Sequence, residues 1–538
     1  MAVNDQPWLD ALLRVEAYPH DPGRGDEVRR IDTHISHVFL TGDRAYKLRR
    51  PVKLAFLDFS SPGERLADCL REVELNRRLA PHVYLGLAPV LVEGSRAFFG
   101  SVAETPSEDP RAVEHAVVMR RLEAGRDLRS MIERGEARSA HVDRVAGVLA
   151  RFHAAHGLGR PAPFAAGDWL ARTTGPARAN FDALSHADPA LAPPDEVAEV
   201  RARAERFVED RRADFEERRV RGRVVDAHGD LHCEHVWFER DEAEPLLIDC
   251  LEFREDFRRI DAASDVAFLA MDLTYRGRED LASRFLRRYA RASADYHLFS
   301  VVDYFLSYRA MVRAKVASLV AVDGSLPEEQ RRHAAESTRR HLDLGLAFLA
   351  ARPKGLLVLT CGSIGSGKTT VAEALADQLD GVVVSSDRVR RDPALATSSA
   401  SNVEHGSGRY SDASRAAVYE RLLEEARAVV LSGRTAILDA TFSRRAWRDR
   451  AREWARTDAV GCFLVEVEAD EGDVRARLAA RSAAANDASE AGPGLYDAMR
   501  AEFEKADEWP ANARARISTS SVNWRGHVEA VGARIARR

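Results

Sequence analysis

The stretch from Leu356 to Thr370, LLVLTCGSIGSGKTT, constrains the fold more than any other part of this chain. An apolar run of strand-forming residues leads into a glycine-rich turn, and a helical pattern with Val371, Leu375 and Leu379 follows at once. A phosphate-binding P-loop occurs in this order of strand, turn and helix. The glycines let backbone N–H groups surround an anion, and the helix N-terminus adds partial positive charge. The sequence therefore predicts an α/β domain with a parallel sheet and a phosphate site.

The side chains of this loop have expected roles in binding a nucleotide. Lys368 should reach the β- and γ-phosphates of ATP, and the Thr369 hydroxyl should bind Mg²⁺. The predicted phosphate-binding set is Gly362, Ser363, Gly365, Ser366, Gly367, Lys368, Thr369 and Thr370. A chance loop of glycine, serine and lysine would lack the matching strand and helix on its two sides.

Length and composition set the frame around this motif. A chain of 538 residues exceeds one ordinary core, so we expect about two to four domains. A formal net charge of −5, with both signs interspersed, argues against a large nucleic-acid surface. The five cysteines are scattered, which suggests free thiols in a reducing cytoplasm. No apolar run approaches about 20 residues, so a cytosolic protein is predicted, with no membrane segment.

The best domain break is Arg352-Pro353-Lys354-Gly355, because a new strand begins directly after it. We therefore expect one domain over residues 1–352 and a second over 353–538. In the first domain, Ser61 to Glu64 form a capping box that begins a helix. The other expected elements are strands and turns over 31–59, with one strand from Ile31 to Leu40, further strands over 83–92 and 97–102, mostly helix over 125–220 and 260–350, and a mobile loop over 482–494.

Lysine is rare in this chain, because nearly all basic residues are arginine. It occurs only at positions 47, 53, 315, 354, 368 and 505. Lysine suits a phosphate site where a small, rotatable ammonium must fit. The P-loop accounts for Lys368, and Lys47 is the next candidate.

Two strand-like runs in the C-terminal half end in aspartates. Asp387 follows the run from Gly381, and Asp439 ends the run from Thr435. Carboxylates at the ends of parallel strands lie where α/β sheets bind ligands. Asp439 is placed to hold the Mg²⁺ shell, and Asp387 to take the proton of an acceptor hydroxyl, with Arg390 clamping the acceptor or the phosphoryl group. The alternative for Asp387 is a helix N-cap.

Arg477 and Arg481 lie four residues apart on one face of a predicted helix. That face would close over ATP and stabilise charge on the transferring phosphoryl group, or it is simply a solvated basic stripe. The set GSIGSGKT, SSDRVRR, LDATF and RARLAAR resembles P-loop kinases of the polynucleotide kinase, gluconate kinase and zeta-toxin type, often called AAA-family ATPases. The resemblance covers about 350–520. It implies that Asp387 activates the acceptor and that Arg477 or Arg481 is a lid arginine.

A second signal lies in the N-terminal half. The run Asp226-Ala-His228-Gly229-Asp230-Leu-His232-Cys-Glu-His235 precedes an apolar run that ends in Asp249. A His-x-Asp loop followed about twenty residues later by a strand-end aspartate is typical of eukaryotic-type kinases. In such sites the first aspartate accepts the hydroxyl proton and the second binds Mg²⁺.

This region resembles the aminoglycoside phosphotransferase and choline kinase group, which implies a two-lobed α+β kinase-like domain. The resemblance makes Asp230 the base, Asp249 the metal ligand and Asp265 a structural aspartate. It also makes Lys47 the ATP-pairing lysine, oriented by Glu72 or by its rival Glu74. A lysine on a strand near a helix glutamate would align the α- and β-phosphates. The whole chain looks like bacterial fusions of these two domains.

The N-terminal half departs from this pattern in two places. His235 stands where the family has an asparagine that binds a second Mg²⁺, and imidazole is a poor ligand for that ion. No G-x-G-x-x-G loop precedes Lys47. The main hypothesis is an ATP-dependent kinase for a small hydroxylated molecule, with one or two active sites. The alternatives are a regulatory, degenerate N-terminal half, and an NTPase switch or toxin-like module with a macromolecular partner.

Overall fold

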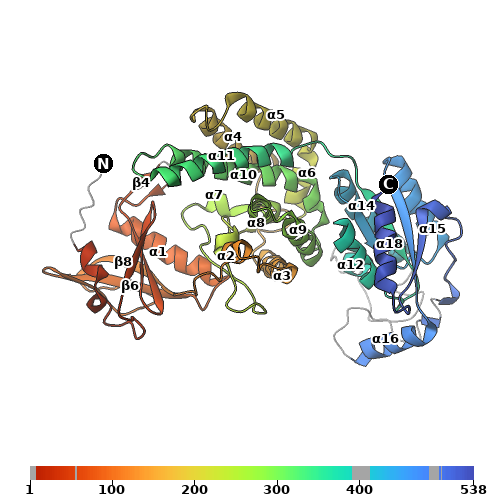
Figure 1. The fold of residues 1–538 in the computed structure, drawn as a ribbon, viewed down its shortest axis with the longest axis horizontal. Helices are drawn as coiled ribbons and strands as arrows, with labels where there is room; N and C mark the ends of the chain where they lie inside the picture. The colour runs from red at the N-terminus through yellow and green to blue at the C-terminus, as the bar shows by residue number, and fades with distance from the viewer. Residues whose placement is uncertain (1–7, 55–56, 391–411, 484–495, 498–499, 538) are drawn as a thin grey trace. The chain divides into compact units, whose positions relative to one another are not determined.

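The computed structural model describes residues 8–54, 57–390, 412–483, 496–497 and 500–537 (Figure 1). The chain forms two compact units. Unit 1 consists of residues 1–175 and 219–278, and unit 2 of residues 176–218 and 279–538. The loop predicted over 482–494 lies almost entirely outside the described residues.

Unit 1 contains a six-stranded antiparallel sheet in the order β1-β2-β3-β8-β6-β7. Its strands are β1 (Arg29–Asp32), β2 (Ser36–Leu40), β3 (Arg44–Arg49), β6 (Tyr84–Glu93), β7 (Arg96–Phe99) and β8 (Ala112–Arg120). Side chains alternate along β3: Tyr46 and Leu48 join the apolar core on one face. Lys47 and Arg49 point to the other face, where they contact helix α1 (Pro62–Arg77). Strand β3 thus places two cationic side chains, Lys47 and Arg49, against helix α1.

The sequence predicted most of this sheet and missed one central strand. Helix α1 begins as expected, with the Ser61 side chain accepting a hydrogen bond from the Glu64 N–H. The single strand expected from Ile31 to Leu40 is wrong, because a turn at Thr33 divides it into β1 and β2. Strand β8 escaped prediction because Glu114 interrupts its apolar residues. In the structure Glu114 is buried and forms an ion pair with Arg65 of α1.

The rest of unit 1 carries the loop that the sequence singled out. Strand β9 leads into this loop, η3 ends it, and α8 packs against η3. The remaining elements are η1 (Leu9–Leu13), η2 (Val15–Ala17), β4 (Lys53–Leu54), β5 (Leu57–Asp58), α2 (Leu128–Glu133), α3 (Ser139–Ala155), β9 (Val224–Asp226), η3 (Cys233–His235), β10 (Val236–Trp237), β11 (Leu246–Leu247), α7 (Glu255–Arg258), β12 (Arg259–Asp261) and α8 (Ala262–Tyr275).

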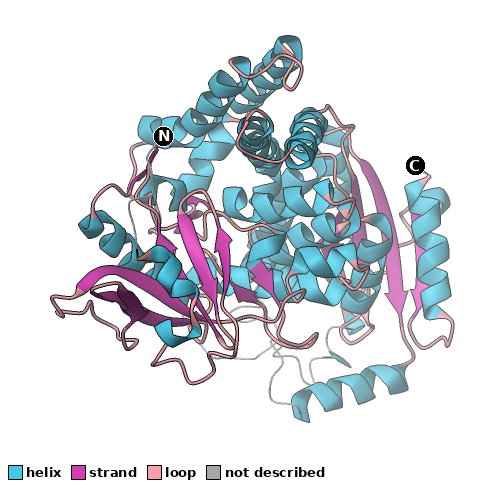
Figure 2. Cartoon of the chain, turned by 60° about the vertical axis from the view of Figure 1, so that its left-hand side comes forward, coloured by secondary structure: helices cyan, strands magenta, loops and turns pink. Residues whose placement is uncertain are grey.

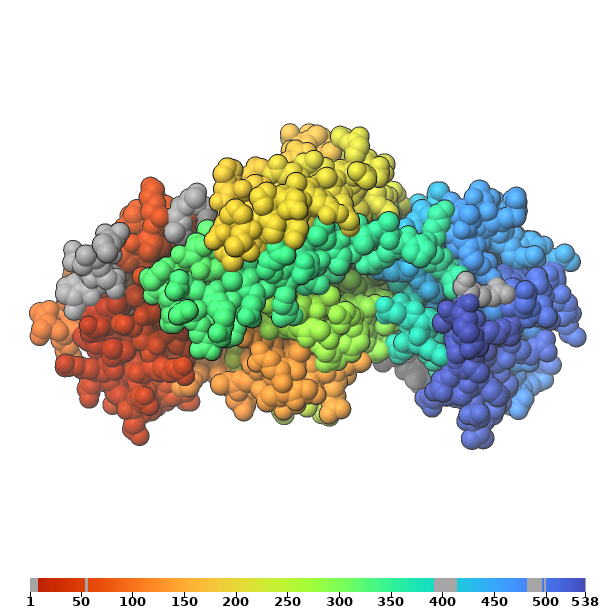
Figure 3. Space-filling model, turned by 45° about the horizontal axis from the view of Figure 1, so that its top comes forward, coloured from red at the N-terminus to blue at the C-terminus, as the bar shows by residue number. Residues whose placement is uncertain are grey.

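Unit 2 begins with helices, as the sequence predicted for most of 125–220 and 260–350. Helices α10 and α11 pack along each other and against α5, which Figure 3 shows in yellow beside the green α11. The helices of this part are α5 (Pro194–Asp210), α9 (Glu279–Ser293), η4 (Tyr296–Ser300), α10 (Val302–Ala321) and α11 (Glu328–Phe348). Helices α4 (Ala166–Ser185) and α6 (Arg212–Val220) cross the borders between the units.

The second part of unit 2 is a five-stranded sheet in the order β14-β15-β13-β16-β17, with all neighbours parallel. Its elements are β13 (Leu356–Cys361), α12 (Lys368–Leu379), β14 (Val382–Ser385), α13 (Ser386–Val389), α14 (Asp412–Leu431), β15 (Ala436–Asp439), α15 (Arg445–Thr457), β16 (Gly461–Glu468), α16 (Glu471–Ala483), η7 (Ala511–Ala513), β17 (Arg514–Ser518) and α18 (Trp524–Ala536). Figure 2 shows these strands in magenta with helices beside them. The predicted fold class, α+β followed by parallel α/β, is confirmed.

The cysteines and helices show two further features. All five cysteines are free thiols, and four of them are buried. Within the described parts of the chain, no helix is both long and apolar enough to cross a membrane.

Candidate functional site

The N-terminal candidate site is centred on Lys47 of β3, whose ammonium joins two acids from distant segments. Its Nζ lies 2.8 Å from Oε1 of Glu72 and 2.7 Å from Oδ1 of Asp249. Burial lowers the pKa of Lys47, but the two carboxylates outweigh it and raise the pKa well above its ordinary value. Glu72 is fully buried, whereas the rival Glu74 is exposed. The contact to Lys47 is therefore made by Glu72.

Asp249 follows β11 in an unusual backbone conformation. Its φ is 61°, a left-handed value that a non-glycine residue adopts only when its surroundings hold it. The Asp249 N–H donates to the Tyr84 hydroxyl at 3.0 Å. Although partial burial raises the pKa of the Asp249 carboxyl, Lys47 outweighs it and holds the pKa well below its usual range. Asp249 is thus an ionised acid presented at the strand end.

The loop that carries Asp230 is hydrogen-bonded through its backbone to Asp265 of α8. The Asp265 carboxylate accepts hydrogen bonds from the N–H groups of His228 (3.2 Å) and Gly229 (2.8 Å), and it contacts Nε2 of His153 at 2.9 Å. Burial raises the pKa of Asp265, but these partners bring it down to about 2. This geometry agrees with the structural role that the family resemblance implies for Asp265.

The histidines of this loop contact other parts of the site. Nε2 of His228 lies 2.8 Å from the carbonyl oxygen of Ile248, and burial lowers the pKa of His228 to about 4. His228 is therefore a neutral scaffold that ties the loop to the strand before Asp249. The rings of His232 and His235 lie side by side, tilted by 36°, with centroids 3.9 Å apart. His235 reaches Asp249, with Nε2 3.5 Å from Oδ2.

Sequence reasoning missed the cation next to Lys47. Arg49 is almost fully buried and its Nη2 contacts three carboxylates: Asp68 and Glu72, each at 2.7 Å, and Glu252. Arg49 therefore fixes the second oxygen of the glutamate that holds Lys47. In a chain rich in arginine, composition gives no reason to select this one. Its position two residues after Lys47, on the same strand face, is the signal that could have found it.

The C-terminal candidate site lies at the carboxyl edge of the parallel sheet. Gly367 begins α12 with φ 89°, in the left-handed region that favours glycine, and a Cβ there would crowd Thr519. The Thr369 hydroxyl donates to Oδ2 of Asp439 at 2.8 Å, and Nζ of Lys368 lies 2.8 Å from the carbonyl oxygen of Ser363. Burial raises the pKa of Asp439, and Lys368 and Thr369 oppose that shift.

Strand register brings the other predicted acid to the same edge. Ser385 of β14 pairs with Asp439 of β15, which in turn pairs with Thr360 of β13. Asp387 comes two residues after Ser385, is exposed, and lies 3.2 Å from Nη1 of Arg390. Asp387 lies in the first turn of the short helix α13, which follows N-cap Ser385, so Asp387 is not the cap.

Of the two arginines predicted for a lid, Arg477 lies against the P-loop. Its Nη1 donates to the carbonyl oxygen of Gly365 at 3.3 Å and to the Thr519 hydroxyl at 2.8 Å. Thr519, which the sequence did not single out, also donates to the carbonyl oxygen of Ser366 at 2.7 Å. The side chain of Arg481 lies outside the described part of the structure.

The two sites differ in how well they fit Mg²⁺. Thr369 and Asp439 offer hydroxyl and carboxylate oxygens, the hard donors that this ion prefers. In the N-terminal site Asp249 offers the same kind of donor, but its neighbour is an imidazole nitrogen of His235. Imidazole suits transition metals instead, so the donor set for a second Mg²⁺ does not fit there.

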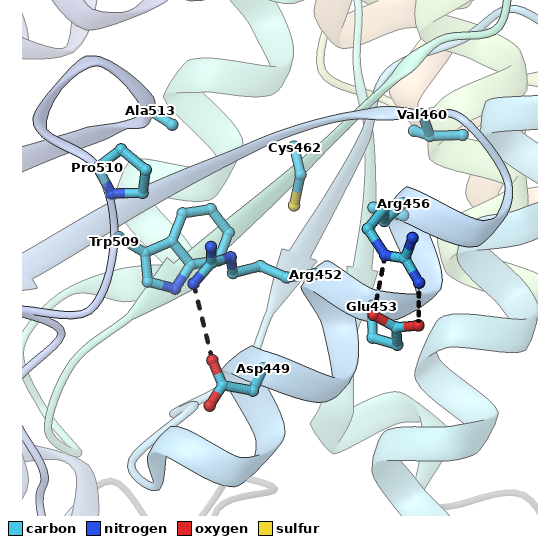
Figure 4. A pocket seen from close by; sticks show the side chains of 10 residues that line it. Asp449, Arg452, Glu453, Arg456, Val460, Cys462, Trp509, Pro510 and Ala513 are labelled. Carbon is cyan, nitrogen blue, oxygen red and sulfur yellow. Dashed lines mark hydrogen bonds and ion pairs between the residues drawn. The ribbon is translucent and has the colours of Figure 1, made fainter.

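A pocket in unit 2 lies away from the phosphate site (Figure 4). Cys462 lines it and pairs in register with Leu357, near the beginning of β13, so the pocket is at the amino edge of the sheet. Its arginines are already engaged: Arg452 lies over the Trp509 ring at 5.2 Å, and Arg456 pairs with Glu453 at 2.7 Å. The pocket is therefore separate from the P-loop, which lies at the carboxyl edge.

Comparison with known proteins finds one family match in each half of the chain. Residues 28–300 match the phosphotransferase enzyme family, and residues 357–506 match a family described as an AAA domain. Uncharacterized proteins of Mycobacterium tuberculosis and Mycobacterium bovis are 33% identical over 508 residues, which cover 93% of this chain and 95% of each relative.

Solved structures include two kinases with similar parts. Choline kinase from Cryptosporidium parvum is 12% identical with a TM-score of 0.36, over 62% of this chain and 92% of that chain. The APS kinase of Mycobacterium tuberculosis, in complex with AMPPNP and APS, is 18% identical with a TM-score of 0.26, over 34% of this chain and 98% of that chain. The assignment rests on the sequence matches, and by these the chain belongs to the phosphotransferase enzyme family.

Proposed function

We propose that this protein is an ATP-dependent kinase that phosphorylates a hydroxyl group of a small molecule, with a P-loop site in unit 2 and a second site in unit 1. The observation that carries the proposal is the pair of contacts from Lys47 to Glu72 and Asp249, alongside a separate P-loop with its own Thr369–Asp439 contact. Each half of the chain thus has one lysine for phosphates and one carboxylate for a metal. Two such constellations favour phosphoryl transfer over simple ligand binding.

In unit 1, Lys47 would hold the α- and β-phosphates, and Glu72 would keep its ammonium in place. Asp230 would accept the proton of the acceptor hydroxyl. The acceptor oxygen then forms a bond to the γ-phosphorus while the bond to the bridging oxygen breaks, and ADP leaves with that electron pair. Asp249 would hold a metal ion, which when bound neutralises charge on the phosphates.

In unit 2, the backbone N–H groups of the P-loop would surround the phosphates, with Lys368 as the mobile cation. Thr369 and Asp439 would hold Mg²⁺, which when bound neutralises charge on the β- and γ-phosphates. Asp387 would accept the acceptor's proton, and Arg390 would orient the acceptor or the phosphoryl group. Arg477 or Arg481 would serve as the lid arginine, and the contact of Arg477 with the loop supports Arg477.

The test is a mass-spectrometric screen for phosphorylated products, with ATP, divalent metal and a pool of aminoglycosides, sugars, nucleosides and short RNA. Wild type, Lys368→Ala, Asp230→Asn and the double variant are compared. We expect products that depend on one or the other residue, and none from the double variant. Full product formation by the double variant would sink the proposal. ATP consumption without any product, stimulated by RNA or a protein, would favour a switch with a macromolecular partner.

A second candidate is regulation of the P-loop kinase by the N-terminal half. The family match extends to residue 300 and so includes α9, which packs its arginines on the acidic face of α12 within unit 2. On this reading unit 1 binds a nucleotide or ligand without transferring phosphate. Retention of all activity in Asp230→Asn, together with its loss in Lys368→Ala, would favour this candidate.

A further inference from the structure

One ring nitrogen of His235 is hydrogen-bonded to the backbone, and the other faces the carboxylate of Asp249. Nδ1 lies 2.8 Å from the backbone carbonyl oxygen of Asp230. A carbonyl can only accept, so Nδ1 carries the hydrogen. In the neutral ring, Nε2 then has a free lone pair. Histidines that bind metals are usually fixed in this way, by donating the other N–H to a carbonyl or a carboxylate.

The two carboxylate oxygens of Asp249 have different partners: one is bound to Lys47 and the other faces the His235 ring. Oδ1 of Asp249 accepts a hydrogen bond from Lys47 at 2.7 Å, and Oδ2 lies 3.5 Å from Nε2 of His235. The Asp249 side chain is 42% exposed and that of His235 14%, so the pair opens toward solvent rather than into the core. A ligand can therefore reach both atoms.

The separation of these atoms fits two ligands of a single ion. Donors about 2.1 Å from a metal lie about 3.0 to 3.4 Å apart in octahedral or tetrahedral geometry. A contraction of a few tenths of an ångström brings the pair to that spacing. One nitrogen and one oxygen leave the remaining positions for phosphate oxygens and water.

We infer that Nε2 of His235 and Oδ2 of Asp249 form a site for a divalent cation of a first-row transition metal, in the series from Mn²⁺ to Zn²⁺, in place of a second Mg²⁺. Imidazole nitrogen raises affinity for these ions far more than for hard Mg²⁺. The inference rests on the proposed function of unit 1, because the ion would bridge Asp249 and the nucleotide phosphates. It makes the N-terminal site selective for a different metal from the P-loop site.

A rival arrangement uses the neighbouring donors Asp230, His232 and His235, which also lie within reach of one ion. There the His235 nitrogen that lies close to the Asp230 carboxylate is Nδ1, 3.9 Å from Oδ2. That nitrogen is already committed to the Asp230 carbonyl. The pair with Asp249 needs no such rearrangement, and the geometry favours it.

The experiment uses Mn²⁺ as the probe on the full chain, in a Lys368→Ala, Asp439→Asn background that weakens the P-loop metal site. Histidine labelled with nitrogen-15 is incorporated, and pulsed electron paramagnetic resonance detects coupling between Mn²⁺ and the labelled nitrogen. We expect a coupling in this background, its loss in His235→Asn, and at least tenfold weaker Mn²⁺ binding. The same substitution should bring the Mn²⁺ and Mg²⁺ affinities closer together.

His232→Asn is the matched control, since the His232 ring lies beside that of His235, with centroids 3.9 Å apart, and its Nε2 lies 4.0 Å from Oδ2 of Asp230. It should leave the nitrogen coupling in place. Loss of coupling in His232→Asn would support the rival arrangement, and Mn²⁺ without any histidine coupling would overturn the inference. Absence of Mn²⁺ binding would also overturn it. The readout needs no turnover, so it separates failure of this site from failure of the proposed kinase activity.

Discussion

The two candidate sites are built in opposite ways. The P-loop places eight predicted phosphate-binding residues within nine consecutive positions, and the pair proposed to hold a metal is completed by one neighbouring strand end. The site in unit 1 draws on four separate segments, and the contact from Lys47 to Asp249 spans 202 residues of sequence. The P-loop relies on backbone N–H groups, whereas the unit 1 site relies on ion pairs. The first depends on a local turn, and the second on the whole unit being folded.

This difference has an energetic consequence. Charges taken out of water cost several kcal/mol each, and partners offset that cost only while all of them are present. Arg49, Asp68, Glu72 and Glu252 are all buried around Lys47. Removing one member leaves another charge buried without compensation. We therefore expect substitutions in unit 1 to affect stability and activity together, and substitutions in the P-loop to affect mainly activity.

The largest effect should come from Asp265→Ala. This change leaves the N–H groups of His228 and Gly229, and Nε2 of His153, without their acceptor. Removing one partner from a buried ionic contact costs about 3–5 kcal/mol. We expect faster hydrogen exchange over residues 227–235, measured by mass spectrometry, and loss of unit 1 activity. Nucleotide binding at the P-loop should remain.

Asp58→Ala serves as the control for this prediction, because Asp58 lies on the surface and pairs with exposed Lys53. It should leave exchange over 227–235 unchanged. Equal protection of the loop in Asp265→Ala and wild type would contradict the view that the unit 1 site depends on long-range support.

The next effect concerns Lys47→Ala, which removes the ammonium shared by Glu72 and Asp249. Loss of one positioned electrostatic group lowers turnover about 10²–10³-fold, or roughly 2.7–4 kcal/mol. We expect that drop in the unit 1 product and no change in the product that depends on Lys368. Lys53→Ala is the matched control, since Lys53 is 73% exposed. An equal loss of both products in Lys47→Ala would mean that the sites are not independent.

The contrast also explains what the sequence could predict. The P-loop strand, its helix and the strand that ends in Asp439 were predicted correctly, because each signal is a short run with its own periodicity. Asp387 lies two residues beyond the end of its strand, in α13. Asp230 and Asp249 were found from the His-x-Asp loop and the later strand-end aspartate, Lys47 from the rarity of lysine, and the resemblance assigned their roles. Their meeting in space follows from the antiparallel sheet and α8, which no local spacing encodes.

The missed features share one physical cause, since each depends on a partner far away in sequence. Glu114 reads as a break in an apolar run until Arg65 pairs with it. Arg49 reads as one more surface arginine until three buried carboxylates surround it. The choice between Glu72 and Glu74 required the rotation of α1 relative to β3, which the helical pattern alone left open.

A smaller effect should follow from Glu373→Lys, which tests how α9 holds the P-loop helix. Glu373 of α12 pairs with Arg288 at 2.5 Å and also contacts Arg291. Reversal of the Glu373 charge places like charges next to each other. It should lower the free energy of unfolding by about 1–3 kcal/mol, which a lower melting temperature would report. Charge reversal of both arginines in the same chain should restore part of the loss, as a double-mutant cycle would measure. Glu336→Lys, on the exposed face of α11, should change nothing. No recovery in the combined variant would exclude a specific role for these pairs.

The last effect is a gradual pH dependence that Glu252 should impose on unit 1. Burial raises the pKa of Glu252 from an ordinary 4.5 to about 8, with Arg49 opposing the shift and Glu72 adding to it. Because the folded state keeps this proton more tightly than the unfolded state, its contribution to stability is complete below pH 4.5 and is lost as the pH rises toward 8. Urea unfolding should therefore show the free energy of unfolding falling over this range, by at most about 1.4 kcal/mol for each pH unit. Glu252→Gln cannot lose that proton, so its profile should be flatter, while Glu74→Gln should follow wild type. A wild-type profile as flat as that of Glu252→Gln would contradict this prediction. It would show that Arg49 keeps Glu252 ionised over the whole pH range, so that the buried network includes the Glu252 carboxylate as a negative charge.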